Sequence, residues 1–294
     1  MKFCGFIWAP AFNFYQDIIH DIHQIYDVEG YSIYNFEEKT YESTVLEVYT
    51  TDDISPLTVK NVKLPAMKMY SPRFVYFTFE LPDPKYRQKG TGTLISTAIE
   101  NIKKEIRTKF KTRINGYTHD IIIHMSDNTD QTQQISEIMK KYDSYKTHEF
   151  IQTKLFLRKQ FHNGEFHRMD ILVRRNAIRT GNFELYNLMQ VTRGAKYDAV
   201  KQFKELISSL DNNSFDENKS KIFYKGDYLL ADGSHRLSYA YHYNVSFVPV
   251  LRNEQMIVTG FGNYNLMWFI THGFSSDQIQ IIKDEFEYLV EYLS

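Results

Sequence analysis

The chain has 294 residues, which is enough for two domains of ordinary size. Its formal net charge at pH 7 is −1, so no overall basic field favours nucleic acid or an anionic membrane as a partner. A single cysteine, Cys4, excludes an intrachain disulfide and fits a reducing compartment. No stretch approaches the roughly 20 apolar residues of a transmembrane helix. We therefore expect a cytoplasmic protein with no transmembrane segment.

The N-terminal segment has the pattern strand, helix, strand. Phe3 to Trp8 is an apolar run typical of a buried strand, residues 18–26 carry apolar side chains at helical spacing, and Tyr31 to Phe36 is a second strand. This order is typical of a parallel α/β layer. We expect residues 1–150 to form a Rossmann-like α/β domain that binds its ligand at the carboxyl ends of the strands.

A loop is predicted over residues 82–92, which contain two prolines, two glycines and the cations Lys85, Arg87 and Lys89. Arg87 belongs to the candidates for a second functional site, because a basic loop can close over an anionic substrate. The alternative is an ordinary surface connection.

Polar residues follow a run of three isoleucines at 121–123. His124, Asp127 and Asn128 thus lie where a central strand ends, a favoured place for ligand-handling residues. They are candidates for binding a nucleotide, a sugar or a metal. The alternative is that Asp127 or Asn128 caps the following helix and that His124 is a satisfied core group.

The second domain is expected over residues 160–294, after a polar stretch at 143–165. Asp170 to Val173 is interpreted as its first strand, and residues 197–210 have the spacing of a helix. Several arginines in this half are candidates for neutralising charge on a substrate: Arg174, Arg175, Arg179 and Arg193.

The strongest chemical signal is the segment from Tyr228 to Leu237. An apolar run ending at Ala231 predicts a strand, Asp232-Gly233 predicts a turn, and a helix is expected to start near Ser234. Free amides and the positive end of the helix dipole would then bind an anion. The predicted phosphate site consists of four consecutive residues: Gly233, Ser234, His235 and Arg236. Asp232 is left to bind a metal ion or take a proton; the alternative is a tight turn with solvated charges.

This segment, with Ala240, Asn244 and Val248-Pro249-Val250, resembles the signature of the ParB/sulfiredoxin superfold. That family includes CTP-binding chromosome-partition proteins, sulfiredoxins and free-serine kinases. The resemblance implies that the turn holds nucleotide phosphates and that Asp232 lies beside the transferred phosphate. Ser234 stands where sulfiredoxins carry their reactive cysteine, so the resemblance does not extend to sulfinic-acid repair. The arginine-rich nucleotide box of the partition proteins has no clean copy either.

The leading hypothesis is therefore a nucleotide-dependent phosphotransferase of mixed α/β (α+β) fold that acts on a hydroxyl of a small molecule or sugar. Such a kinase needs an anion cradle, a bridging metal and a base. Asp232 and His235 are its expected catalytic residues, Asp232 the expected metal ligand, and ATP or another nucleoside triphosphate or diphosphate with Mg²⁺ the expected cofactors.

Two alternatives remain open at this point. One is a nucleotide-sugar transferase whose site lies in the N-terminal domain, at His124, Asp127 and Asn128, with Arg87 and Arg193 as further candidates. The other is a ParB-like module that binds nucleotide and switches a partner interaction without catalysis. The near-neutral charge disfavours nucleic acid as that partner, and ten scattered histidines with one cysteine show no zinc-ligand spacing.

Overall fold

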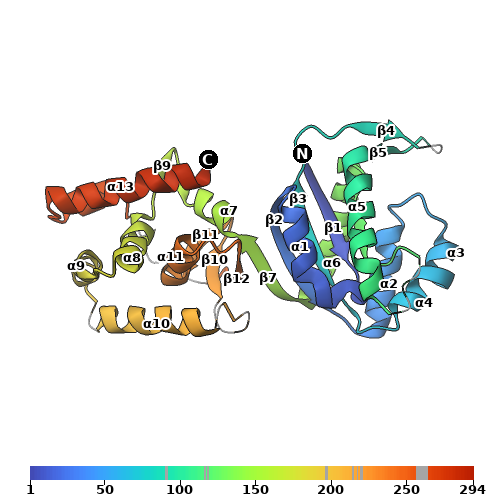
Figure 1. The fold of residues 1–294 in the computed structure, drawn as a ribbon, viewed down its shortest axis with the longest axis horizontal. Helices are drawn as coiled ribbons and strands as arrows, with labels where there is room; N and C mark the ends of the chain where they lie inside the picture. Colours follow the sequence, from blue (N-terminus) through green and yellow to red (C-terminus); the bar gives the residue numbers. More distant parts are fainter. Residues whose placement is uncertain are drawn as a thin grey trace. The chain divides into compact units, whose positions relative to one another are not determined.

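The computed structural model describes the chain except for residues 90–91, 116, 118, 196–197, 214, 217, 219–220 and 256–263. Its internal contacts divide the chain into two compact units, Met1–Glu149 and Phe150–Ser294 (Figure 1). Both units combine helices with a sheet, so the α/β class expected from the sequence is confirmed. Among the helices that the structure describes, none is both long and apolar enough to cross a bilayer.

The sheet of the first unit has the strand order β2-β3-β1-β6. Its strands are β1 (Lys2–Ile7), β2 (Asp27–Asn35), β3 (Arg73–Glu80) and β6 (Ile123–Met125). Every neighbouring pair is antiparallel, as the partners Phe3 and Phe79, Tyr31 and Phe77, and Phe6 and His124 show. With α1 after β1 and α5 before β6, this connectivity is that of the ferredoxin-like β-α-β-β-α-β arrangement.

The parallel, Rossmann-like layer predicted for the first unit is therefore wrong. β1 and β2 do run in the same direction, but β3 lies between them and is antiparallel to both. β3 can occupy this central place because it buries apolar rings on both faces of the sheet, among them Phe74 and Phe77. A strand-helix-strand pattern is satisfied equally well whether the two strands are neighbours or are separated by a third.

Helices cover both faces of this sheet. α1 (Tyr15–His23) and α5 (Thr97–Phe110) lie on one face, in front of the strands in Figure 1. α2 (Glu38–Tyr49) and α6 (Thr129–Lys141) pack on the other face, over Cys4, Phe6 and Trp8 of β1 and its extension. The short elements of this unit are η1 (Ala9–Phe14), α3 (Pro56–Thr58), η2 (Val59–Lys63), α4 (Leu64–Met67), β4 (Tyr86–Gln88), β5 (Leu94–Ser96), η3 (Lys111–Arg113) and η4 (Asp143–Tyr145).

β6 ends the strand order of this unit, and side chains of α5 cover its outer carbonyl groups. Arg107 Nη2 donates to the carbonyl oxygen of Ile123 at 3.0 Å, and Lys103 Nζ lies 3.5 Å from that of Met125. The intervening carbonyl of His124 lies on the side of β1, 3.0 Å from where a Cβ on Gly5 would stand. The free side of β6 is thus occupied by cationic donors.

The sheet of the second unit is built on β10 (Ile222–Lys225), which is antiparallel to β11 (Leu229–Asp232) and parallel to β12 (Phe247–Arg252). β7 (Lys146–Gln152) leads the chain into this unit, and β8 (Phe161–His162) pairs with β9 (Glu165–Phe166). The helices are α7 (Thr153–Arg158), α8 (Met169–Thr180), α9 (Glu184–Thr192), α10 (Ala199–Asn213), α11 (Ser234–His242), α12 (Leu266–Thr271) and α13 (Ser276–Leu293).

The strand predicted over Asp170 to Val173 is wrong, because these residues open α8. Every residue from Met169 to Ala177 is buried, so α8 is the central helix of this unit and shows no polar face from which its period could be read. A short apolar run in such a setting does not separate a strand from a buried helix.

Gly5→Ala should destabilise the first unit. A Cβ on Gly5 would lie 2.5 Å from the Phe77 ring and 3.0 Å from the backbone oxygen of His124, so both neighbouring strands would have to shift. We expect a loss of about 1–3 kcal/mol in the free energy of unfolding, the usual cost of overpacking a core. Urea denaturation of the full chain measures it, and an unchanged midpoint would contradict the packing described for β1.

Candidate anion-binding site

The turn between β11 and α11 has the geometry that the sequence predicts. β11 ends at Asp232, Gly233 adopts φ 95° and ψ 20°, and α11 begins at Ser234. The Gly233 amide donates to Asp232 Oδ1 at 2.6 Å. A Cβ on Gly233 would stand 3.1 Å from the Cα of Ile222 on β10, so the turn packs directly against the neighbouring strand. Glycine is needed here for both its backbone angle and its size.

The first turn of α11 presents free amide groups. Gly233 caps the helix without a side-chain hydrogen bond, and its carbonyl accepts the Leu237 amide at 2.9 Å. In the part of the chain that the structure describes, the amides of Ser234, His235 and Arg236 meet no acceptor. Together with the positive end of the helix dipole, three such amides favour an anion.

A buried carboxylate in the first turn of α8 holds two arginines. Asp170 is fully buried and receives two hydrogen bonds from Arg168, at 2.8 Å from Nε and 3.0 Å from Nη2. Arg174 Nη1 donates to the Asp170 carboxylate and to the Asp170 carbonyl, both at 2.7 Å. Arg168 also donates to the carbonyl of Leu230 at 3.2 Å, which connects this cluster to the strand that leads into the turn.

Two of the nearby guanidinium groups have unused donors. Arg174 is 1% exposed, yet its Nε has no hydrogen-bond partner among the described residues, and neither has the buried Nε of Arg236. Arg236 makes a long contact from Nη1 to the Lys221 carbonyl, at 3.5 Å. Arg193 lies over the ring of Tyr264 at 4.3 Å. Buried donors without an acceptor are costly, and an anion would satisfy them.

Electrostatic effects tie these groups to the α11 turn. The two arginines bound to it hold the pKa of Asp170 well below its usual range despite burial, and Arg193 contributes in the same direction. Burial, followed by repulsion from Arg174, lowers the pKa of His235 to about 2. Asp232 in turn favours the charged form of Arg168. The arginines and Asp170 therefore act on one region, next to the first turn of α11.

His235 is consequently neutral at physiological pH. Its Nε2 lies 2.8 Å from the Tyr186 hydroxyl, and its ring packs on Phe203 with centroids 4.7 Å apart. His235 therefore adds no positive charge to the predicted phosphate site. His235 anchors the first turn of α11 to α9 and α10.

Of the basic run on α8, only Arg174 belongs to this cluster. Arg175 and Arg179 bind Glu285 of α13, and Asn176 donates to the same carboxylate at 3.2 Å. The Arg179 contacts are 2.9 Å from Nε and 2.8 Å from Nη2. These groups fasten α8 to α13, and their charge is neutralised in part by a buried glutamate.

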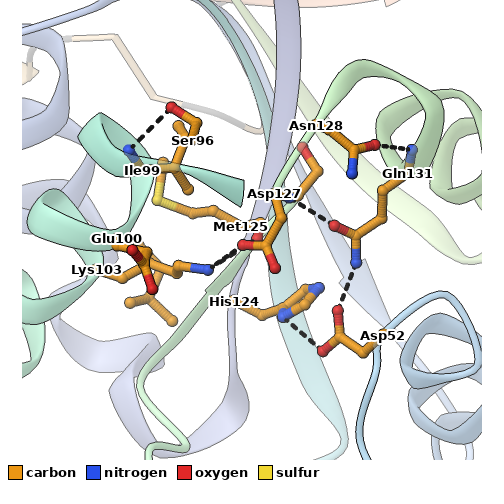
Figure 2. Close-up of polar contacts among 12 residues, drawn as sticks. Asp52, Ser96, Ile99, Glu100, Lys103, His124, Met125, Asp127, Asn128 and Gln131 are labelled. Carbon is orange, nitrogen blue, oxygen red and sulfur yellow. Dashed lines mark hydrogen bonds and ion pairs between the residues drawn. The ribbon is translucent and has the colours of Figure 1, made fainter. Parts of the chain in front are cut away.

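The second set of candidate residues lies in the first unit, where β6 ends (Figure 2). Asn128 caps α6, accepting the Gln131 amide at 2.9 Å, as the alternative interpretation expected. Asp127 forms an ion pair with Lys103 of α5 at 2.6 Å. Both side chains are thus engaged in holding helices against the sheet.

His124 belongs to a buried polar network at the same place. Its Nδ1 lies 3.6 Å from Asp52 Oδ2, and its buried Nε2 has no hydrogen-bond partner in the part of the chain that the structure describes. Gln131 links this pair to the strand end, donating to Asp52 and accepting the Asp127 amide (Figure 2). Burial lowers the pKa of His124, so its imidazole is neutral. Asp52 and Lys103 come from distant segments, and no motif in the sequence connects them with His124.

Arg87 lies on the β4–β5 hairpin, where it pairs with Glu100 at 2.8 and 2.7 Å. This exposed pair fastens the hairpin to the first turn of α5. Part of the predicted loop, residues 90–91, lies outside the described residues. Arg193 is a residue of the second unit and belongs with the arginines near α11.

Comparison with known proteins adds little. No protein-family model matches the chain, and no curated protein matches it. A solved structure of the Aquifex aeolicus nucleoside diphosphate kinase aligns with a TM-score of 0.32 and 14% sequence identity, over 47% of this chain and 93% of that chain. We draw neither a family nor a function from a likeness of this size.

Gly233→Ala should distort the α11 turn. The substitution combines an unfavourable backbone angle with a contact to the β10 backbone, and we expect a loss of about 2–4 kcal/mol in unfolding free energy. Gly226→Ala is the matched control, since Gly226 has φ +55° and no atom within 4 Å of an added Cβ, so it carries only the backbone cost of about 1 kcal/mol. Equal losses in the two variants, measured by urea denaturation, would contradict the close packing of the turn.

The second unit should lose stability in mild acid because of His235. A histidine whose folded-state pKa is about 2 stays neutral in the native protein, while the unfolded chain takes up a proton below pH ~6.5. Stability is therefore complete above that pH and falls by up to about 1.4 kcal/mol for each pH unit below it. His235→Gln, which does not titrate, should flatten the pH dependence of unfolding between pH 7 and 5; an identical slope in both proteins would refute this assignment.

Proposed function

We propose that the protein is a nucleotide-dependent phosphotransferase that binds polyphosphate at the α11 turn and transfers a phosphoryl group to a hydroxyl of a small molecule or sugar. ATP or another nucleoside triphosphate, with Mg²⁺, is the proposed donor. The carrying observation is the coincidence of three free amides with Arg174, a buried arginine that retains an unpaired N–H. The ParB/sulfiredoxin-like character of the second unit is part of this proposal, and the strand-turn-helix geometry at Gly233 supports it.

Charge balance favours a polyanion over a single carboxylate as the ligand. Four arginines lie in this region, Arg168, Arg174, Arg193 and Arg236, against two carboxylates, Asp170 and Asp232. With His235 neutral, four positive and two negative charges leave an excess of two. Phosphoryl transfer requires this kind of preorganised charge, because its transition state spreads negative charge over the phosphate oxygens.

Asp232 is the proposed catalytic carboxylate. It is exposed at the end of β11, and its Oδ1 accepts the Gly233 amide, which fixes its orientation and leaves Oδ2 for a ligand. Within the described residues no three His, Cys, Asp or Glu side chains gather as a metal cage. This suits Mg²⁺, which is commonly held by one or two carboxylates together with substrate phosphates and water. Asp232 would bind that ion or take the proton of the attacking hydroxyl.

A nucleotide-binding switch without catalysis is the second candidate. It is favoured by the neutral state of His235, which leaves Asp232 as the one proposed acid-base group at the turn. A nucleotide-sugar transferase site in the first unit has less support, because Asp127 and Asn128 are engaged by Lys103 and by the α6 amide.

Asp232→Asn separates these possibilities. We expect the variant to bind nucleotide about as well as the unmodified chain and to lose at least about 100-fold in turnover, since it removes a metal ligand or base and leaves the amides and arginines in place. Binding is measured by thermal shift with ATP, ADP, CTP, GTP and UDP-glucose, with and without Mg²⁺. Turnover is measured as nucleoside diphosphate formed in the presence of serine, glycerol, glucose or inositol.

Asp227→Asn is the control, because Asp227 lies in the β10–β11 connection and pairs with Lys159. Nucleotide binding without turnover in the unmodified chain would favour the switch. Binding that survives Gly233→Ala and Arg174→Met together would place the nucleotide elsewhere and end the proposal.

A further inference from the structure

We propose that Tyr264 is a positioning residue of the α11 site, where its ring holds the guanidinium group of Arg193 in contact with the phosphates of the ligand. This inference rests on the proposed function, because it concerns the same polyphosphate. Arg193 directly follows α9, and Tyr264 lies two residues before α12.

The face of α9 that carries Arg193 is the face directed at the α11 turn. Tyr186, on this face, lies 2.8 Å from His235 Nε2, and its ring centroid is 5.9 Å from the guanidinium carbon of Arg174. Arg193 comes seven residues after Tyr186, which is two helical turns and about 10 Å along the axis. The side chain of Arg193 therefore starts from the end of the stripe that α9 packs against the arginine cluster.

The backbone at the end of α9 is fixed by a Schellman motif. Gly194 adopts φ 80°, and its amide donates to the Val191 carbonyl at 2.9 Å. The Ala195 amide donates to the Gln190 carbonyl at 3.0 Å. These bonds end the helix directly after Arg193 and give its side chain a defined starting point.

Tyr264 is held beside the first turn of α8. Its amide donates to the His167 carbonyl at 3.1 Å, and its carbonyl accepts the Met169 amide at 3.0 Å. These two bonds flank Arg168, which donates to the strand that ends at the turn. The guanidinium carbon of Arg193 lies 4.3 Å from the centroid of the Tyr264 ring. The ring thus fastens Arg193 to the segment that carries the arginine cluster.

This stacking holds a cation next to an existing excess of positive charge. Arg193 makes no side-chain hydrogen bond or ion pair with any residue that the structure describes. Burial lowers the pKa of Arg174, and repulsion from Arg193 lowers it further. A cation–π contact at an exposed position is weak. Phosphate oxygens between the two guanidinium groups would replace their repulsion by attraction, since both groups would then donate charge-assisted hydrogen bonds.

The test is a double-mutant cycle on the binding of inorganic tripolyphosphate to the full chain, measured by isothermal titration calorimetry. We expect Arg193→Gln to weaken binding about tenfold, because a charge-assisted contact is lost. Tyr264→Leu should weaken it about threefold, whereas Tyr264→Phe keeps the ring and should bind like the unmodified chain. In the Arg193→Gln background, Tyr264→Leu should have no further effect, because the ring acts through Arg193.

Arg158→Gln is the matched control. It removes another exposed arginine of the same unit, one that donates to the Leu293 carbonyl of α13, and it should leave tripolyphosphate binding unchanged. Circular dichroism of each variant checks that it is folded. Because Arg193 is exposed, its substitution tests the inference even if Tyr264→Leu lowers stability.

The outcomes separate this inference from the proposed function. If the unmodified chain binds no tripolyphosphate, the polyphosphate site is wrong and both proposals fail. If it binds and Arg193→Gln leaves the affinity unchanged, this inference alone fails. It also fails alone if the losses from Arg193→Gln and Tyr264→Leu add in full, since the ring would then act independently of Arg193.

Discussion

The second unit depends on a carboxylate that is closed off from water. Asp170 accepts hydrogen bonds from Arg168 and Arg174, and through Arg168 it connects α8 to Leu230 of β11. Moving one carboxylate and two guanidinium groups out of water costs desolvation free energy. Their mutual attraction offsets that cost only while all three partners are present. Removing one partner of such a cluster commonly costs 3–5 kcal/mol, because the remaining charges stay buried. The positions of Arg168 and Arg174 are therefore set by this single side chain.

The same cluster supplies the positive charge on which the proposed anion site depends. One carboxylate neutralises one of the two guanidinium groups that it orients, and the surplus charge lies in a site of low dielectric constant, where it acts strongly. Burial and the positive charge of Arg174 lower the pKa of the nearby His235, so its imidazole is neutral. The ring lies against Tyr186 and Phe203. The protein thus places fixed charge on arginine, which does not titrate, and uses histidine as a neutral anchor.

Much of the geometry of the α11 turn was predictable from the sequence because its signals are local. An apolar run, a glycine that must adopt a positive φ and a helical pattern follow one another within ten residues, and each acts on its own neighbours. The role of Asp170 was not predictable in this way. It lies more than sixty residues before the turn, in a segment whose complete burial hides the helical period, and its short apolar run was interpreted as a strand.

In the first unit, too, the elements were predictable from neighbouring residues, whereas the pairings between distant segments were not. Residues 1–36 gave the correct sequence of strand, helix and strand, but the strand that separates them begins at Arg73, so the parallel pairing inferred from the local pattern was wrong. Asn128 as a helix cap follows from its neighbours, whereas the partners of His124 and Asp127 come from α5 and from the segment after α2. Pairings across the chain are decided by packing, which one sequence does not display.

The cationic side chains of α5 that lie along β6 have a consequence for association between molecules. A bare outer strand offers its backbone to any extended peptide, and chains that pair in this way stack into fibrils. Arg107 and Lys103 occupy the outer carbonyl groups of Ile123 and Met125, which such a peptide would need. The helix that buries one face of this sheet thus also covers the carbonyl groups along the outer side of β6.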